Sequence, residues 1–154
     1  MKNNFFDFLE SRGFIHQSTD KESIKKLFKD DVCTGYIGFD CTSDSLHVGS
    51  LLPLMILRNF QKFGHKPIIL VGGGTTLIGD PSGKDETRKI LTKEEIDNNK
   101  KKLRIIFEKF VSFDKNQVNC AVIVDNYDWL MQLKLIPFLR EVGSKFSVNK
   151  MINL

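Results

Sequence analysis

The hydrophobic positions form two short continuous runs, and one short β-leaning segment precedes them; two longer stretches, in which apolar residues recur at helical spacing, separate these three. The short segments cover residues 34–39, 68–71 and 121–124, and the longer stretches cover 47–63 and 92–110. Runs of this length are typical of buried strands, and the longer periodic stretches predict helices. The order is therefore β-α-β-α-β. It predicts an α/β fold, a Rossmann-like doubly wound parallel sheet with helices on both faces.

Ligands of such sheets bind beyond the carboxyl ends of the strands. In this chain those ends are the loops after Phe39, Val71 and Val124. The helix over 47–63 has apolar residues around most of its circumference, so we expect it to be largely buried. No helix is predicted between Val71 and Thr92, where the chain is polar and rich in glycine.

Short helices are predicted at both ends of the chain. One covers residues 3–12, and a second covers 23–29 after a capping box at 19–22. These form an N-terminal helical segment, 1–33, before the main unit, 34–154. The tail predicts a helix over 133–142, a break at Gly143 and a further helix from Ser147 that is cut off at Leu154, which suggests a truncated chain.

The composition is that of one globular domain with a core. The 154 residues are 41% hydrophobic and 27% charged, with a net charge of +4 that is spread among acidic residues. This charge is compatible with a nucleic-acid partner without requiring one. Cys33, Cys41 and Cys120 form no C-x-x-C pair, which argues against a zinc site or a disulfide framework and favours a reducing cytoplasm. No segment approaches the roughly 18 apolar residues of a membrane-spanning helix.

Two common phosphate-binding motifs are excluded by their spacing. The sequence Gly79-x-x-x-Gly83-Lys84-Asp85 is one residue short of a Walker A loop, and Asp85 stands where Ser or Thr would hold magnesium. Nor does a G-x-G-x-x-G sequence open a helix in this stretch. The chain is therefore neither a P-loop protein nor a standard dinucleotide-binding protein.

A strand, polar loop and helix start over residues 36–50 suit a nucleoside triphosphate. Backbone N–H groups and the positive end of the helix can face phosphates, and Thr42 and His47 add side-chain donors. Gly38 and Gly49 allow a planar base to approach closely. The alternative is that Thr42 and Asp44 merely cap a helix and His47 is an ordinary residue of its first turn.

Several blocks of sequence resemble the tyrosyl-tRNA synthetases, a family of class I aminoacyl-tRNA synthetases. His47-Val48-Gly49-Ser50 is similar to the HIGH signature of class I. The whole set, in family order, is Tyr36-x-Gly38-Phe39-Asp40-x-Thr42-x-x-Ser45-Leu46-His47, Val71-Gly72-Gly73, Leu77 to Lys84, Asn126-Tyr127-Asp128-Trp129 and Phe138 to Gly143. A four-letter match is weak, whereas the set is highly specific.

The resemblance implies a role for each matching residue. Tyr36 would hydrogen-bond the phenol of tyrosine, Asp80 would hold its ammonium group, and Asn126 would support the pocket. Thr42 and His47 would bind the outgoing phosphates, with Lys84 and Arg88 on a loop that closes over them. The alternative for Tyr36, Lys84 and Arg88 is an ordinary surface position. ATP-binding residues would be Gly38, Asp40, Thr42, His47, Gly49 and Ser50.

The resemblance also implies substrates and partners. They are tyrosine, tRNA(Tyr) and ATP carrying Mg²⁺ on its phosphates, with no metal site in the protein, no membrane and a homodimer through the helices around 129–142. Ser50 departs from the usual His or Asn at the fourth HIGH position, and the family's KMSKS loop is absent from these residues, so we expect the chain alone to be inactive. Alternatives are a tryptophanyl-tRNA synthetase, against which Tyr36 argues, and a non-catalytic nucleotide- or RNA-binding module derived from a synthetase.

Overall fold

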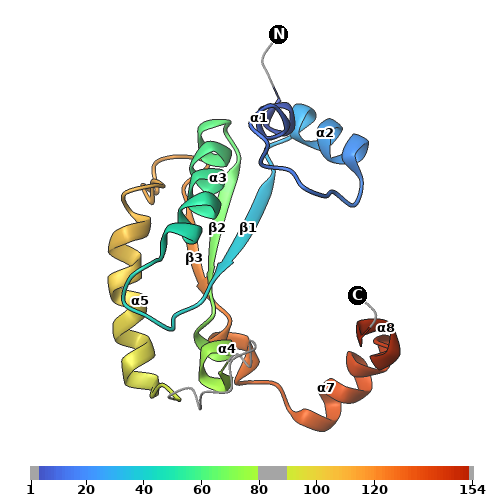
Figure 1. Ribbon diagram of the computed structural model, residues 1–154, viewed down its shortest axis with the longest axis vertical. Coiled ribbons are helices and arrows are strands. Elements are labelled where there is room, and N and C mark those ends of the chain that lie inside the picture. The colour runs from blue at the N-terminus through green and yellow to red at the C-terminus, as the bar shows by residue number, and fades with distance from the viewer. Residues whose placement is uncertain (1–3, 80–89, 153–154) are drawn as a thin grey trace.

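A parallel sheet of three strands forms the centre of the computed structural model, which describes residues 4–79 and 90–152. Strands β1 (Thr34–Phe39), β2 (Lys66–Val71) and β3 (Val122–Asp125) lie in the order β1-β2-β3 (Figure 1). All three strands carry the β-branched and other apolar residues expected of a buried sheet. The α/β class and the parallel sheet predicted from the sequence are confirmed.

The two crossover connections pack on one face of the sheet. A 3₁₀ turn η1 (Val48–Ser50) leads into α3 (Leu51–Lys62) between β1 and β2, and α5 (Lys93–Phe107) connects β2 with β3. Right-handed crossovers between strands in the order β1-β2-β3 place both helices on the same side. The capping box predicted for the second crossover is present, with Thr92 as the N-cap of α5.

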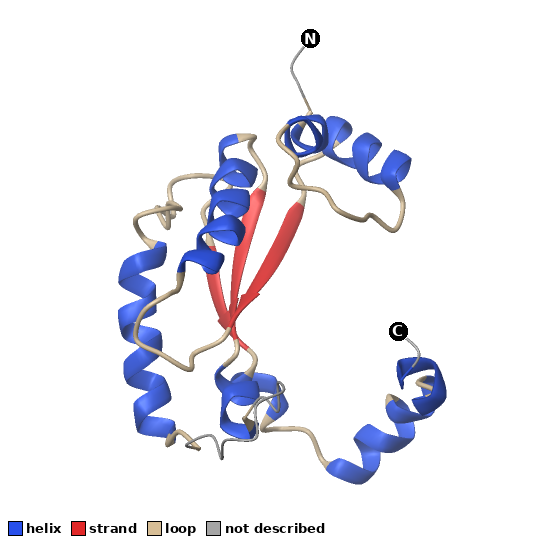
Figure 2. Cartoon of the chain, in the orientation of Figure 1, coloured by secondary structure: helices blue, strands red, loops and turns tan. Residues whose placement is uncertain are grey.

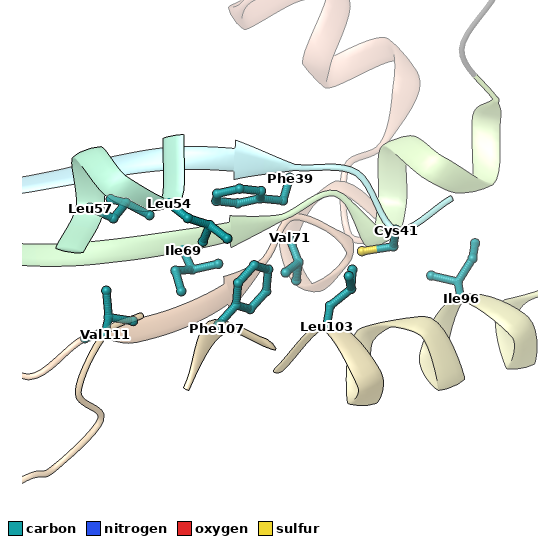
Figure 3. Packing of buried hydrophobic residues seen from close by; sticks show 11 residues of the cluster. Phe39, Cys41, Leu54, Leu57, Ile69, Val71, Ile96, Leu103, Phe107 and Val111 are labelled. Atoms are coloured by element: carbon teal, nitrogen blue, oxygen red, sulfur yellow. The ribbon is translucent and has the colours of Figure 1, made fainter. Parts of the chain in front are cut away.

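The main core lies between this face and the two crossover helices. Figure 3 shows Phe39, Ile69 and Val71 from the sheet against Leu54 of α3 and Phe107 of α5. Phe107 is the largest fully buried side chain in the part of the chain that the structure describes. Removing water from this apolar surface is the main stabilising contribution.

The opposite face of the sheet is open in the described part of the chain. Tyr36 of β1 is exposed, and Ile68 and Leu70 of β2 are half-buried. The helices expected on both faces are therefore seen on one face within residues 4–79 and 90–152. The helix over 47–63 is also less buried than predicted, because Leu51 and Leu52 at its start are exposed.

Two short helices lie at the carboxyl ends of the strands, where the sequence predicted none. They are α4 (Gly73–Ile78) and α6 (Tyr127–Leu130). The chain then extends away from the sheet as an arm of α7 (Leu135–Glu141), η2 (Gly143–Lys145) and α8 (Val148–Ile152), shown in Figure 2. The predicted break at Gly143 is confirmed by the start of η2.

The N-terminal helices cover the other end of the sheet. Helix α1 (Phe5–Ser11) contributes Phe5, which packs against Phe28 of α2 (Lys21–Asp30) and Phe60 of α3. The predicted capping box at 19–22 is wrong in register, because Asp20 is the N-cap and accepts the Ser23 N–H. The helix therefore begins at Lys21, two residues before its predicted start. None of the helices described is long and apolar enough to cross a membrane.

Candidate functional site

A pocket of about 390 Å³ lies where β1 ends and the chain turns toward η1. Six residues singled out in the sequence line it: Gly38, Asp40, Thr42, His47, Gly49 and Ser50. A larger cavity, about 1010 Å³, lies among the N-terminal helices beside Phe5, Lys62 and His65. That cavity is at the amino ends of the strands, whereas ligands of parallel sheets bind at the carboxyl ends. The smaller pocket is therefore the candidate site.

His47 is oriented by the backbone of its own turn. It is the N-cap of η1, and its Nδ1 accepts the Gly49 N–H at 3.0 Å. A neutral ring that accepts at Nδ1 carries its proton on Nε2, which leaves one donor for a ligand. A Cβ at position 49 would lie 2.7 Å from His47 Cε1, closer than real Cβ atoms approach. A side chain at position 49 would therefore force the exposed His47 ring out of this orientation.

Asp40 and Thr42 flank a residue that is completely buried. Cys41 is 0% exposed, while Asp40 and Thr42 are exposed toward the pocket. Burial, together with the charge of Asp125, raises the pKa of the Cys41 thiol to about 11. Cys41 therefore stays a neutral thiol at physiological pH and acts as an apolar anchor in the core.

The end of β3 holds the start of α4. Asp125 Oδ1 accepts the Gly73 N–H at 3.0 Å, and Asn126 Oδ1 accepts the Gly74 N–H at 2.7 Å. Lys100 of α5 pairs with Asp125 Oδ2 at 2.7 Å. Burial acts to lower the pKa of Lys100, but hydrogen bonds to Asp125 and Asp97 outweigh it, so the pKa is raised and the lysine stays charged.

Of the three residues predicted to bind tyrosine, the structure describes Tyr36 and Asn126. Tyr36 is 70% exposed on the open face of the sheet. Asn126 is 9% exposed, and its amide is engaged with Gly74 and with Thr75 Oγ1. Asp80, Lys84 and Arg88 lie outside the described residues.

Sequence reasoning missed the side chains that bind the Cys41 backbone and the start of α4. Thr76, Asn99, Lys100 and Asp125 come from three other elements, and no local motif marks them. Their contacts span sequence separations of 25 to 58 residues. In the described ranges, no group of three or more His, Cys, Asp or Glu side chains is arranged to hold a metal ion.

A comparison with known families identifies the family of the chain. Residues 29–154 match the family model described as tRNA synthetases class I (W and Y). The chain belongs to this class I synthetase family. The match confirms the resemblance carried by the blocks of sequence around His47 and Asn126.

Curated relatives of this chain include tyrosine–tRNA ligases. Those of Clostridium tetani and Beijerinckia indica are each 52% identical to it, over 152 and 151 residues. These alignments cover 99% and 98% of the chain, but only 37% and 36% of the relatives. The chain thus spans little more than a third of their length.

Solved structures agree on the fold. A C-terminally truncated mitochondrial tyrosyl-tRNA synthetase of Aspergillus nidulans superimposes with a TM-score of 0.80 at 25% identity, over 99% of this chain and 46% of that one. The tryptophanyl-tRNA synthetase of Plasmodium falciparum gives 0.63 at 16% identity, over 99% of this chain and 37% of that one. The second likeness shows the shared Rossmann-like fold alone.

Proposed function

We propose that this chain is the ATP-binding part of a longer tyrosine–tRNA ligase. One observation carries the nucleotide assignment: six residues of the HIGH-like stretch line a single pocket at the carboxyl end of β1. The curated relatives, at 52% identity, support tyrosine as the amino acid rather than tryptophan.

In the reaction we infer, the carboxylate of tyrosine attacks the α-phosphate of ATP and pyrophosphate leaves. The tyrosyl group then passes from the adenylate to the terminal ribose of tRNA(Tyr), with release of AMP. Thr42 and His47 donate hydrogen bonds to phosphate oxygens, and Mg²⁺ arrives on the nucleotide. Such chemistry depends on positioning and on stabilising phosphate charge, so it needs donors and cations rather than a nucleophilic side chain.

The other assignments rest on the same family membership. Gly38 leaves open space for a base, since an added Cβ there would meet no atom within 4 Å. Lys84 and Arg88 would supply cations to the phosphates, and Asp80 would bind the substrate ammonium beside Tyr36 and Asn126.

We also propose a division into an N-terminal helical segment, 1–33, and a catalytic part that begins at 34, and that the longer protein works in the cytoplasm as a homodimer. Leu135, Ile136 and Leu139 of α7 are exposed apolar side chains, as a dimer surface would require.

The nucleotide assignment can be tested by titrating MgATP into the ¹⁵N-labelled chain and following the amide signals of Gly38 and Gly49. Thr42→Ala and His47→Ala should each weaken binding about ten- to a hundredfold, since hydrogen bonds to charged groups contribute roughly 1.5–3 kcal/mol. His16→Ala, at an exposed histidine of the N-terminal segment, is the matched control. Unchanged affinity in both pocket variants would refute the assignment.

The amino-acid assignment needs the longer polypeptide. Tyrosine-dependent exchange of pyrophosphate into ATP should occur, and tryptophan should not replace tyrosine. Exchange that depends on tryptophan, or none with any amino acid despite ATP binding, would contradict it.

A further inference from the structure

The peptide groups on both sides of Cys41 are held by side chains from two other elements. The Cys41 N–H donates to Thr76 Oγ1 of α4 at 3.2 Å, and Asn99 Nδ2 of α5 donates to the Cys41 carbonyl at 2.9 Å. The first group belongs to the peptide plane shared with Asp40, and the second to the plane shared with Thr42. Because peptide groups are planar, these two bonds fix the orientation of both planes.

The Cys41 side chain supplies a third point of attachment. It is 0% exposed and lies in the core among Val71, Ile96 and Leu103, between the end of the sheet and α5 (Figure 3). The residue therefore cannot rotate without breaking two buried or part-buried hydrogen bonds and opening the core. Its two neighbours along the chain are the pocket residues Asp40 and Thr42.

We propose that Thr76 and Asn99 are positioning residues, which direct Asp40 and Thr42 into the pocket by clamping Cys41 between them. The inference rests on the proposed nucleotide function of that pocket. Neither Thr76 nor Asn99 lines the pocket, so both act through Cys41.

The two helices that carry the clamping side chains are tied to the end of β3. Helix α4, which carries Thr76, is fixed at its start by Asp125, whose Oδ1 accepts the Gly73 N–H. Asn99 is the neighbour of Lys100, which pairs with the same carboxylate at 2.7 Å. Asp125 thus links α4 and α5, and the clamp is continuous from β3 to the pocket loop.

The first pair of variants isolates the hydroxyl of Thr76. Thr76→Val keeps the shape of the side chain but removes the oxygen that accepts the Cys41 N–H, whereas Thr76→Ser keeps that oxygen. We expect Thr76→Val to raise the MgATP dissociation constant about three- to tenfold, the equivalent of one net hydrogen bond, and Thr76→Ser to stay near the parent. Amide hydrogen exchange at Cys41 should be faster in Thr76→Val than in the parent, and should stay near the parent rate in Thr76→Ser.

The second pair uses neighbouring asparagines of α5. Asn99→Ala removes the donor to the Cys41 carbonyl, and Asn98→Ala changes an exposed residue of the same helix. Asn99→Ala should weaken MgATP binding by a similar factor, and Asn98→Ala should not.

A double variant separates positioning from a general loss of stability. If Asn99 acts by orienting Thr42, whose peptide plane it holds, then Asn99→Ala should weaken binding much less in a chain that already carries Thr42→Ala. All titrations are made at a temperature where each variant is folded by circular dichroism. Equal losses in both backgrounds, or normal affinity in Thr76→Val, would overturn the inference while leaving the proposed function intact. Failure of the unmodified chain to bind MgATP, or unchanged binding in both Thr42→Ala and His47→Ala, would instead overturn the proposed function, and the inference with it.

Discussion

Lowering the pH from 7 to 5 should destabilise the chain through one buried histidine. His65 is 4% exposed, and its Nδ1 accepts the Cys33 N–H at 3.2 Å. The rings of Phe28 and Phe60 lie 5.1 and 4.8 Å from its ring. Burial therefore lowers the pKa of His65 below its usual 6.5, and a protonated Nδ1 could no longer accept the Cys33 N–H.

The direction of the change in stability depends on whether the folded or the unfolded chain binds a proton at the higher pH. In the unfolded chain His65 titrates near 6.5, whereas in the folded chain it stays neutral to lower pH. The free energy of unfolding is thus fully retained above pH 6.5. It falls as the pH drops below that value, by at most about 1.4 kcal/mol per pH unit, and levels off below the folded pKa.

Two other groups with shifted pKa values, Asp44 and Cys33, act outside this window. A hydrogen bond from Lys102 lowers the pKa of Asp44. The contribution of Asp44 to the free energy of unfolding is therefore present above pH 3.8 and is lost only as the pH falls below that value. Burial raises the pKa of Cys33 above 9.0, so the contribution of this thiol to the free energy of unfolding is lost only at alkaline pH.

Urea unfolding followed by circular dichroism at intervals from pH 5 to 7 would measure the effect. His65→Gln retains an acceptor for the Cys33 N–H but cannot ionise, so its stability should be nearly independent of pH in this range. His16→Gln, at an exposed histidine, should behave like the parent. A parent whose stability does not change between pH 5 and 6.5, or a His65→Gln variant with the parent's slope, would refute the reasoning.

Three further changes test the core and the two sides of the site. Phe107→Ala should cost about 3–5 kcal/mol in urea unfolding, because it leaves a cavity at a fully buried position, and a loss below 1 kcal/mol would contradict the packing. Gly49→Ala should displace the ring of His47 and weaken MgATP binding about tenfold in titrations, while stability falls by roughly 1 kcal/mol; unchanged binding would contradict the orientation described. In the longer polypeptide, Tyr36→Phe should reduce the preference for tyrosine over phenylalanine about tenfold in pyrophosphate exchange, whereas full discrimination with weaker ATP binding would place Tyr36 on the nucleotide side.

The strands were predictable from the sequence because their signals are local. The segments of β2 and β3 contain continuous apolar runs and that of β1 is a short β-leaning run, while the capping box at Thr92 marks the start of α5 without reference to the rest of the chain. Helix α4 was not predictable in this way, since Gly73 and Gly74 are poor helix formers. It is stabilised by Asp125 and Asn126, which accept its first N–H groups from more than fifty residues away along the chain.

The same distinction applies to the site. Gly38, Asp40, Thr42 and His47 follow one another along a single strand and loop, so a motif can identify them together. No local sequence pattern marks Thr76, because its hydroxyl meets the Cys41 N–H only in the folded chain. Residues that line a pocket can therefore be read from a contiguous stretch, whereas residues that hold the pocket in shape cannot.

The described residues form more of the nucleotide side of the proposed site than of its amino-acid side. On the nucleotide side, the pocket has walls from the β1 loop and η1, and its histidine is already oriented by Gly49. On the amino-acid side, Tyr36 stands 70% exposed on an open sheet face, and the amide of Asn126 is engaged with α4. A side chain that is largely in water gains little from a hydrogen bond to a ligand, because water offers the same bond. If Tyr36 binds the phenol of tyrosine as proposed, discrimination among amino acids requires its burial, whereas the exposed donors of Thr42 and His47 would bind charged phosphate oxygens, whose hydrogen bonds are stronger.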